Sequence, residues 1–410
     1  MDALLNKTKI AQTQLALKSE NDINLCLKNI KKALIKNTNF IIEENKKDID
    51  AAQKTGLSSA MIERLTLNEN RIYDLAQSIE NIISLPFYVG EIIESFTRPN
   101  GITINKVRTP FGVVAVIFES RPNVCVDIAC LCLKTANACV LKGGKEAINT
   151  NKALVQIMQN AIKNIVNKDV ITLIESTDRS ITDQLITKKQ FIDLLIPRGS
   201  KGLINYVVSN AKIPYIETGA GNCHLFVDES ASLDMALKIA VNAKHQRPSV
   251  CNAIENIIVH KNCANKFLPM LYEKFSSLNI EIRGDEQTLK IIPVKPATEE
   301  DFYTEYNDYI VSIKIVENID EAIQHINTHS SKHSESIITE NNLNSVKFFN
   351  LIDSACVYHN ASTRFTDGGE FGFGAEIGIS TAKLHARGPM GLKEITTYKY
   401  IISGNGQERK

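Results

Sequence analysis

Residues 110–142, PFGVVAVIFESRPNVCVDIACLCLKTANACVLK, contain the pattern that decides the fold. Two short runs in it, VVAVIF at 113–118 and ACVLK at 138–142, are apolar, rich in β-branched residues and do not alternate. Strands that are buried on both faces of a parallel sheet have this composition. The longer segment between them predicts a helix, so the stretch as a whole predicts a strand, a helix and a second, parallel strand.

The same alternation continues along the chain. Further apolar runs follow at 170–174, 191–197 and 213–217, and segments of helical period such as NTNKALVQIMQNAIKNI (149–165) lie between them. A second series of predicted strands begins near Leu225 and consists of HLFVD, ENIIVH, IVSIKIV, SIIT and ACVY. Repeated strand–helix–strand units predict an α/β fold with a doubly wound sheet, followed by a second α/β domain.

Two other regions have different patterns. The first 93 residues predict helices, because apolar residues recur there at mostly helical spacing between charged ones. After a turn at 98–101, residues 102–108 alternate as a half-exposed strand does. With 410 residues, the chain is expected to form two or three domains, since single cores stop growing at about 250–300 residues.

The composition excludes several classes of protein. Charge is balanced, with 47 Lys and Arg against 46 Asp and Glu, so we expect neither nucleic acid nor a membrane surface as partner. The longest apolar stretch, 124–133, falls short of the ~20 residues that span a bilayer, and the N-terminus lacks the pattern of a secretory signal. Nine scattered cysteines without a C-x-x-C pair predict reduced thiols, a cytoplasmic location and no metal site.

Cys251 is the candidate nucleophile. It lies in NAKHQRPSVCN (242–252), between a predicted helix and the predicted strand ENIIVH. Pro248 ends the helix and forces an irregular backbone just before the thiol. Lys244 and Arg247 are close in sequence, and neighbouring cations raise the thiolate fraction of a cysteine. On this chemistry alone, a structural cysteine is an equally good interpretation.

Four blocks of the sequence resemble the gamma-glutamyl phosphate reductase family, which belongs to the aldehyde dehydrogenase superfamily. The peptide QRPSVC (246–251) and the block that contains STRFTDGG (362–369) and HARGPMG (385–391) are highly specific to that family. The stretches 110–151 and 195–229 match it nearly in register. The resemblance implies an aldehyde dehydrogenase-like fold with a doubly wound cofactor domain, an α/β catalytic domain and a small oligomerisation hairpin.

The resemblance also implies a reaction: NADPH-dependent reduction of L-glutamyl 5-phosphate to L-glutamate 5-semialdehyde and phosphate, the second step of proline biosynthesis. Cys251 would be acylated by the substrate, and a hydride would then reduce the thioester. Asn123 corresponds to the superfamily's oxyanion donor and would act with the backbone N–H of Cys251. Without the resemblance, a helix N-cap is the favoured interpretation of Asn123.

Four residues are candidates for binding the substrate. Arg121 and Arg247 would hold the departing phosphate, because a guanidinium group recognises phosphate through two hydrogen bonds. Arg364 would bind the carboxylate of the substrate, and Ser362 or its neighbour Thr363 would assist. Ordinary surface arginines and a structured loop that binds no ligand are the alternatives.

The cofactor site is predicted without a GxGxxG motif, which the chain lacks. Arg198, Gly199 and Gly202 follow the predicted strand at 191–197 and precede a helix. Glycines at such a turn let the backbone approach a pyrophosphate at the N-terminus of the helix. Turns of this kind are common, so the motif by itself is weak.

Two further cofactor contacts follow from the resemblance. Lys142 lies at the position that contacts the adenosine ribose, and Glu305 matches the glutamate that positions the nicotinamide ribose. Lys142, Lys145 or Arg198 would hold the 2′-phosphate of NADPH. No acid stands just after VLK (140–142), so we expect NADP to be preferred over NAD. From sequence alone, Glu305 is just as well explained as part of an acidic loop.

The domain boundaries and partners are predicted as follows. Residues 1–93 and 110–218 would form the NADP-binding domain, 219–388 the catalytic domain, and 94–109 with 389–410 an oligomerisation element. By resemblance, that element joins copies of the chain, so we expect a homo-oligomer, either a dimer or a tetramer. A glutamate 5-kinase that hands over the labile acyl phosphate is a candidate partner.

Other activities remain open. A cysteine acyl hydrolase or transferase would use His245 or His224 as its base. An aldehyde dehydrogenase that oxidises a free aldehyde would require Glu217 as a general base. A reductase has no water to activate, so we expect Glu217 to be dispensable, as an acid at the end of a strand that accepts a backbone hydrogen bond. A non-catalytic binding protein is a third alternative.

Overall fold

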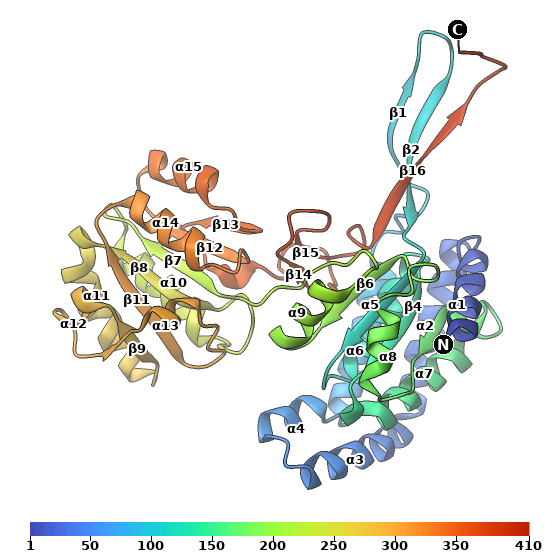
Figure 1. Ribbon diagram of the computed structural model, residues 1–410, viewed down its shortest axis with the longest axis horizontal. Helices are drawn as coiled ribbons and strands as arrows, with labels where there is room; N and C mark the ends of the chain where they lie inside the picture. Colours follow the sequence, from blue (N-terminus) through green and yellow to red (C-terminus); the bar gives the residue numbers. More distant parts are fainter. Residues whose placement is uncertain (410) are drawn as a thin grey trace. The chain divides into compact units, whose positions relative to one another are not determined.

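The structure is a computed structural model that describes residues 1–409 and, within them, all side chains except those of residues 59, 60 and 201. The chain forms two compact units. Unit one comprises residues 1–217, 372–378 and 390–410, and unit two comprises residues 218–371 and 379–389. Each unit has its own parallel sheet (Figure 1).

The main sheet of unit one has four parallel strands in the order β5-β4-β3-β6. From β3, the chain moves outward to β5 and then returns, so that β6 lies on the other side of β3. The carboxyl ends of β3 and β6 therefore flank a switch point, where open α/β sheets bind their ligands. The elements are β3 (Val113–Phe118), α6 (Asn123–Lys134), β4 (Ala138–Gly143), α7 (Ile148–Ile162), β5 (Ile171–Leu173), α8 (Arg179–Leu185), β6 (Leu194–Arg198) and α9 (Lys201–Asn210), with 3-10 turns at Lys145–Ala147 and Lys168–Val170.

Four of the five strands predicted for this region are confirmed, and the fifth, at 213–217, is wrong. Tyr215 forms only a single bridge to Leu195. The N–H of Leu195 donates to the carbonyl of Pro214 (2.9 Å), and the N–H of Ile216 donates to the carbonyl of Leu195 (3.0 Å). Pro214 has no N–H group, so the ladder cannot continue in that direction.

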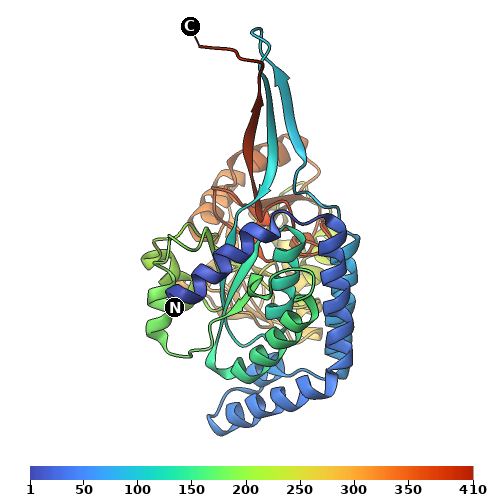
Figure 2. The ribbon, with the colours of Figure 1, turned by 90° about the vertical axis from the view of Figure 1, so that its right-hand side faces the viewer.

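Five helices precede this sheet, and Figure 2 shows them beside it: α1 (Asp2–Leu15), α2 (Glu20–Lys36), α3 (Thr38–Lys54), α4 (Ser59–Leu65) and α5 (Glu69–Ser84). Asp48 of α3 accepts hydrogen bonds from the backbone N–H groups of Asn149 and Thr150 (3.2 and 2.8 Å). The first N–H groups of a helix have no partner within the helix, so Asp48 supplies one for α7 and anchors α3 there.

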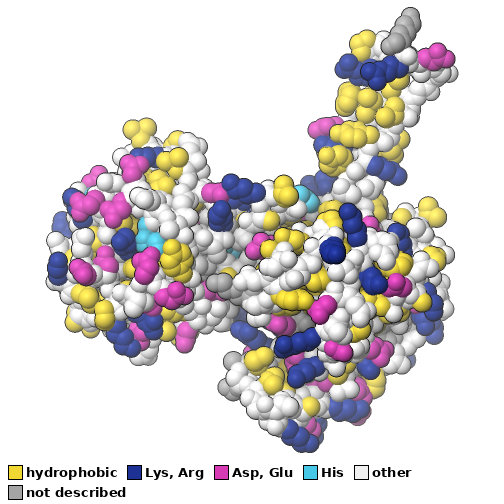
Figure 3. Space-filling view, in the orientation of Figure 1, with side chains coloured by type: hydrophobic (Ala, Val, Ile, Leu, Met, Phe, Trp, Pro, Cys, Tyr) yellow, Lys and Arg dark blue, Asp and Glu magenta, His cyan; other side chains and the backbone are white. Residues whose placement is uncertain are grey.

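A three-stranded antiparallel sheet extends from the rest of unit one (Figures 1 and 2). Its order is β1 (Ile92–Thr97), β2 (Thr103–Pro110) and β16 (Thr396–Ser403). Strand β16 pairs with the whole of β2, from Thr396 opposite Pro110 to Ser403 opposite Thr103. The late segment 394–402 thus joins the hairpin predicted at 94–109. Apolar side chains are visible along this sheet in Figure 3.

Unit two contains a sheet of seven parallel strands in the order β10-β9-β11-β8-β7-β12-β13. Its elements are β7 (Cys223–Val227), α10 (Leu233–His245), β8 (Ile254–His260), α11 (Lys261–Ser277), β9 (Glu281–Gly284), α12 (Glu286–Leu289), β10 (Lys295–Pro296), α13 (Glu299–Tyr303), β11 (Ile310–Val316), α14 (Ile319–His329), β12 (Ser334–Ile338), α15 (Asn342–Leu351) and β13 (Cys356–His359). Three shorter elements follow: a 3-10 turn at Thr363–Phe365, β14 (Ile379–Ser380) and β15 (Gly388–Pro389).

Both faces of this sheet are buried, as the non-alternating strands predicted. Ile257 of β8 belongs to one apolar cluster with Phe267 of α11, and Ile258 belongs to another with Phe348 of α15. The α/β fold class and all five strands predicted for this region are confirmed. Strands β9 and β10 were not predicted, because EIRG is short and half charged and β10 has only two residues.

Two properties of the described part of the chain bear on its class. No helix among residues 1–409 is long and apolar enough to cross a membrane. Within the same range, no three His, Cys, Asp or Glu side chains are grouped so that they could hold a metal ion.

Candidate active site

Cys251 lies in the turn between α10 and β8, at the amino end of β8. The N–H of Ala253 donates to the carbonyl of Val250 (3.0 Å) and closes this turn. Cys251 is partly exposed, whereas the other eight cysteines are buried. Burial raises the pKa of such thiols, for example those of Cys125 and Cys223, and keeps them protonated. Since the thiolate is the nucleophile, exposure singles out Cys251.

The backbone of Cys251 is held by the segment that precedes β7. A Cβ atom on Gly221 would lie 1.6 Å from the carbonyl oxygen of Cys251, so only glycine fits there. The thiol of Cys223 donates to the same carbonyl oxygen (3.1 Å). The N–H of Gly221 donates to Oε1 of Glu305 (2.7 Å). The structure therefore brings Glu305, a predicted cofactor contact, beside the Cys251 turn through one glycine.

Residues 362–366 hold the same turn from another side. Oγ1 of Thr363 donates to the carbonyl of Asn252 (2.6 Å), and Nδ2 of Asn252 donates to the carbonyl of Thr366 (2.9 Å). Ser362 is buried, and its Oγ accepts from the N–H of Arg364 (3.2 Å). The hydroxyl of Ser362 thus caps the 3-10 turn, while Arg364 is brought to the thiol.

Arg364 interacts electrostatically with Cys251 and with a second guanidinium group, that of Arg247. Nε of Arg364 donates to Oε1 of Gln246 (3.1 Å). Burial lowers the pKa of Arg364 and the charge of Arg247 lowers it further, whereas Asp367 and Cys251 raise it. Because the Coulomb interaction is mutual, Arg364 also stabilises a thiolate at Cys251. Arg364, a predicted substrate-binding residue, therefore interacts with the candidate nucleophile, and Arg247 interacts with Arg364.

Lys244 was expected to be a cation near the thiol, and the structure places it elsewhere. Its Nζ lies 2.5 Å from Oε2 of Glu255, and both side chains are completely buried. Burial raises the pKa of Glu255 to about 8 and lowers the pKa of Lys244. Lys244 lies on the packed face of α10, whose neighbours Ala240 and Ala243 belong to the core of unit two. The pair therefore stabilises the end of α10 and does not act on the thiol of Cys251.

The two histidines proposed as bases for a hydrolase have other partners. The ring of His245 lies against Tyr309, with 5.6 Å between the ring centroids. His224 is completely buried, and its Nδ1 lies 3.1 Å from Oε2 of Glu335. Neither contact involves Cys251, which disfavours a hydrolase that would need a histidine base at the thiol.

In unit one, Asn123 lies at the switch point between β3 and β6. The N-cap interpretation is wrong, because Asn123 is the first residue of α6 and Pro122 takes the cap position with helical backbone angles (φ −63°, ψ −25°). An N-cap side chain needs an extended backbone to reach the free N–H groups. Nδ2 of Asn123 instead donates to Oδ2 of Asp127, one turn later (3.1 Å). Arg121, just before the helix, is exposed.

The β6–α9 turn is the site predicted for the pyrophosphate of a dinucleotide. Ser200 caps α9, and its N–H donates to Oε2 of Glu119 (2.7 Å). A Cβ atom on Gly199 would lie 2.5 Å from the same oxygen, so a larger residue there would force the Glu119 side chain to shift. At Gly202, the nearest atom to an added Cβ is 3.9 Å away, which leaves the backbone open. The open glycine at a helix N-terminus fits an anionic ligand.

The surroundings of Lys142 change one argument from the sequence. Lys142 is buried, and its Nζ donates to the carbonyl of Gly143 (3.1 Å). Burial lowers its pKa, while Glu146 raises it, so an acid does lie near Lys142. Oε1 of Glu146 accepts from the N–H and the hydroxyl of Ser120 (2.7 and 2.8 Å). No acid directly follows VLK, but Glu146 comes four residues after Lys142 and lies near it. The absence of an acid directly after VLK is therefore no argument for NADP over NAD. Lys145 is exposed beside this region.

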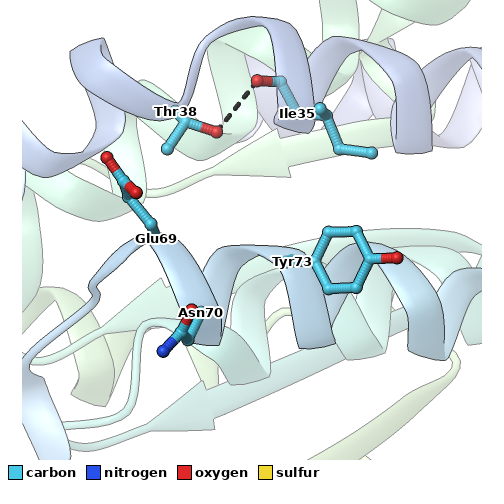
Figure 4. Close-up of a pocket in the computed structure, with 5 residues that line it drawn as sticks. All are labelled: Ile35, Thr38, Glu69, Asn70 and Tyr73. Carbon is cyan, nitrogen blue, oxygen red and sulfur yellow. Dashed lines mark hydrogen bonds between the residues drawn. The ribbon is translucent and has the colours of Figure 1, made fainter.

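One hollow of about 310 Å³ lies elsewhere in unit one, between the end of α2 and the start of α5 (Figure 4). Its lining residues are Ile35, Thr38, Glu69, Asn70 and Tyr73. Thr38 donates to the carbonyl of Ile35 (2.9 Å), as the dashed line in Figure 4 marks. None of the candidate site residues lines this hollow, so it is not the candidate active site.

Comparison with known proteins identifies the family. The model of the Aldehyde dehydrogenase family matches residues 27–310. A gamma-glutamyl phosphate reductase of Dictyoglomus turgidum is 52% identical over 408 residues, which cover 99% of this chain and 98% of that protein. The chain belongs to the gamma-glutamyl phosphate reductase family. A family member from Petrotoga mobilis is 53% identical over 411 residues and covers 99% of both chains.

Solved structures agree with this assignment. The crystal structure of gamma-glutamyl phosphate reductase from Thermotoga maritima has a TM-score of 0.98 and 46% identity, and covers 100% of this chain and 99% of its own. An acetylating aldehyde dehydrogenase from Geobacillus thermoglucosidasius, at 17% identity, has a TM-score of 0.69 over 100% and 97% of the two chains and so shares the fold. Membership of the aldehyde dehydrogenase family indicates an oxidoreductase with a nicotinamide cofactor.

The supporting residues were missed by sequence reasoning. Gly221, Asn252 and Glu119 hold the candidate residues in place, and they lie in the quoted stretches without having been assigned a role. For Asp127 the sequence offered one signal. Apart from Asn123 and Lys134, the other residues of α6 are apolar, and Asp127 is the only acid among them.

Proposed function

We infer that the chain catalyses the NADPH-dependent reduction of L-glutamyl 5-phosphate to L-glutamate 5-semialdehyde and phosphate. The observation that carries this inference is the partly exposed thiol of Cys251, the one cysteine of nine that is not buried, which interacts electrostatically with Arg364. The assignment of the chain to the gamma-glutamyl phosphate reductase family supports the substrate.

Cys251 begins the proposed reaction. Its thiolate attacks the carbonyl carbon of the acyl phosphate, the C–O bond to phosphate breaks, and a thioester remains on the sulfur. Arg247 and Arg364 favour the thiolate and offer donors for anionic groups of the substrate, with phosphate assigned to Arg247 and carboxylate to Arg364. Arg121 is a second proposed phosphate ligand. Ser362 contributes by fixing the backbone of Arg364.

An oxyanion forms when the carbonyl is attacked and again when the thioester is reduced. We assign its stabilisation to Nδ2 of Asn123 and the backbone N–H of Cys251. Loss of one such donor typically costs about 2.7–4 kcal/mol of transition-state stabilisation. The bond from Asn123 to Asp127 uses one of its two amide hydrogens and leaves the other for this purpose.

Unit one would hold the cofactor. Gly202 and the start of α9 would bind the pyrophosphate, and Lys142 with Lys145 or Arg198 would bind the adenosine ribose and its 2′-phosphate. Glu305 would position the nicotinamide ribose. When bound, a dihydronicotinamide supplies the hydride that reduces the thioester to the aldehyde. The choice of NADPH over NADH rests on the cations near Lys142, not on the absence of an acid.

The reverse reaction tests the proposal. Purified protein, glutamate 5-semialdehyde, phosphate and NADP should yield NADPH, detected by its absorbance, and omission of phosphate should abolish the signal. If water instead of phosphate accepts the acyl group, so that glutamate is the product, the chain is an oxidising aldehyde dehydrogenase.

We further propose that the β1-β2-β16 sheet joins two copies of the chain. Its exposed apolar side chains include Ile92 (57% exposed), Tyr400 (53%) and Ile402 (62%), more than a surface of a lone chain normally shows in one place. Replacing Ile402 and Tyr400 by glutamate should halve or quarter the mass measured by light scattering. An unchanged mass would refute this interface. A glutamate 5-kinase that supplies the acyl phosphate remains a proposed partner.

A further inference from the structure

Asp127 is an acid that the proposed reaction does not use. It lies on α6 one turn after Asn123, at the carboxyl edge of the unit-one sheet, and is partly buried. Its Oδ2 accepts the hydrogen bond from Nδ2 of Asn123 (3.1 Å). Among the side chains that the structure describes, which exclude those of residues 59, 60 and 201, none donates a hydrogen bond to its Oδ1, so half of the carboxylate is available. A partly buried carboxylate with one idle oxygen needs an explanation.

The surroundings of Asp127 make its charge costly. Its neighbours on α6, Val126 and Ile128, are buried, and burial raises the pKa of Asp127 to about 6. The hydrogen bond from Asn123 and the charge of Arg198 lower that pKa but do not offset burial. Holding the amide of Asn123 requires only an acceptor, which a neutral side chain would supply without this cost. Arg198, a cation of the chain, offsets only part of the cost, so the negative charge points to a further cationic group that is not part of the chain.

We propose that Asp127 binds the α-ammonium group of the amino-acid substrate while Asn123 donates to its reacting carbonyl oxygen. This inference rests on the proposed function. In a γ-glutamyl group, a short aliphatic chain separates the carbonyl oxygen from the ammonium nitrogen. Asn123 and Asp127, which are joined by a hydrogen bond, are spaced so that one reaches the carbonyl oxygen and the other reaches the ammonium nitrogen. Asp127 would then select amino-acid substrates over acyl phosphates that lack the amine.

The test compares two aldehydes in the reverse reaction with NADP and phosphate. One is glutamate 5-semialdehyde, and the other is 5-oxopentanoate, which is the same molecule without the amino group. The protein should prefer the amino aldehyde by about 100-fold in kcat/KM, as a site that pairs with a buried charged group can achieve. In Asp127→Asn, which keeps an acceptor for Asn123, the preference should fall below about 10-fold through a higher KM for the amino aldehyde.

A matched control is Asp193→Asn. Asp193 also accepts one hydrogen bond from the protein, from the N–H of Val113 (2.8 Å), but at the opposite, amino edge of the same sheet. It should leave the preference unchanged. Turnover of 5-oxopentanoate is an internal measure of folding and should stay within about 3-fold in Asp127→Asn, because that substrate does not use the charge. If Asp127→Asn does not fold, Asp127→Glu, which keeps the charge, should retain a preference above about 10-fold.

Three results would overturn the proposal. An equal loss for both aldehydes in Asp127→Asn would make Asp127 a positioning residue for Asn123 only. Equal kcat/KM values for the two aldehydes in the unaltered protein would show that no group of the protein recognises the amine. If the unaltered protein oxidises neither aldehyde, the proposed function itself fails. This outcome is distinguishable from a failure of the Asp127 proposal, because it is observed before any residue is replaced.

Discussion

The two parallel sheets carry their candidate residues at opposite edges. In unit one, Asn123, Lys142 and Gly202 lie at or after the carboxyl ends of β3, β4 and β6, where the helices begin. In unit two, Cys251 and Gly221 precede β8 and β7, at the amino edge, where α10 ends. Positive helix ends face the first edge, and the negative end of a helix faces the second.

This difference explains which charges each edge needs. The unit-one edge attracts anions through backbone N–H groups, and the protein's own carboxylates, such as Glu119 and Glu146, already use some of them. The unit-two edge must stabilise a thiolate near the end of α10, where the helix dipole opposes it. Arg247 and Arg364 supply the positive charge that the backbone cannot. In the proposed reaction both edges therefore use side-chain cations, and only the unit-one edge adds the N–H groups of helix N-termini.

The sharpest way to break the comparison is to remove the thiol. Cys251→Ala should lower the rate of NADPH formation in the reverse assay by at least about 10,000-fold, because no other group can form the thioester. Cys130→Ala, a buried cysteine of unit one, should keep the activity and lose about 1–2 kcal/mol of unfolding free energy. Full activity in Cys251→Ala would end the assignment of the nucleophile.

The second test concerns the backbone beneath the thiol. Gly221→Ala would place a Cβ atom against the carbonyl of Cys251, and the shift should cost about 1–3 kcal/mol of unfolding free energy and most of the activity. Gly202→Ala, where the added atom finds open space, should not lower the thermal unfolding midpoint. Similar unfolding midpoints for the two variants would mean that Gly221 is not required for packing.

A smaller effect should come from the two arginines. In Arg247→Gln/Arg364→Gln, alkylation of Cys251 by iodoacetamide at pH 7 should slow by about 10-fold, because the thiolate loses both cations. Lys238→Gln removes an exposed charge from α10 farther from the thiol, and we expect the alkylation rate to stay near that of the unaltered protein. Peptide mass spectrometry would locate the modified cysteine. A rate equal to that of Lys238→Gln would show that the arginines do not set the reactivity.

The smallest effect is expected at Glu217. It is the last residue of the first segment of unit one and is not in a strand, since single bridges at Tyr215 and Thr218 flank it. Glu217→Gln should change the reductase rate by less than about 3-fold, because no water has to be activated. Loss of turnover in this variant would favour oxidation of a free aldehyde, and the rates can be compared directly in the forward and reverse assays.

Most of the fold could be predicted from local patterns. The strands Val113–Phe118 and Ile310–Val316 occur with the predicted bounds, because a parallel strand buried on both faces is predominantly apolar. The run at 213–217 failed although its composition is similar. Pro214 breaks the ladder, and the apolar pattern does not register a missing N–H group.

The predictions about the candidate site also divide into those that follow from local sequence and those that needed the tertiary structure. The sequence by itself determined the α/β class, the unusual peptide around Cys251 and the glycine turn after β6, because each depends on residues that are neighbours in the chain. Only the tertiary structure decided that Lys244 is paired with Glu255, that Glu146 folds back toward Lys142, and that Asn123 bonds Asp127 instead of capping α6. Charge, burial and hydrogen bonds depend on which side chains meet in space, and spacing along the chain does not specify that.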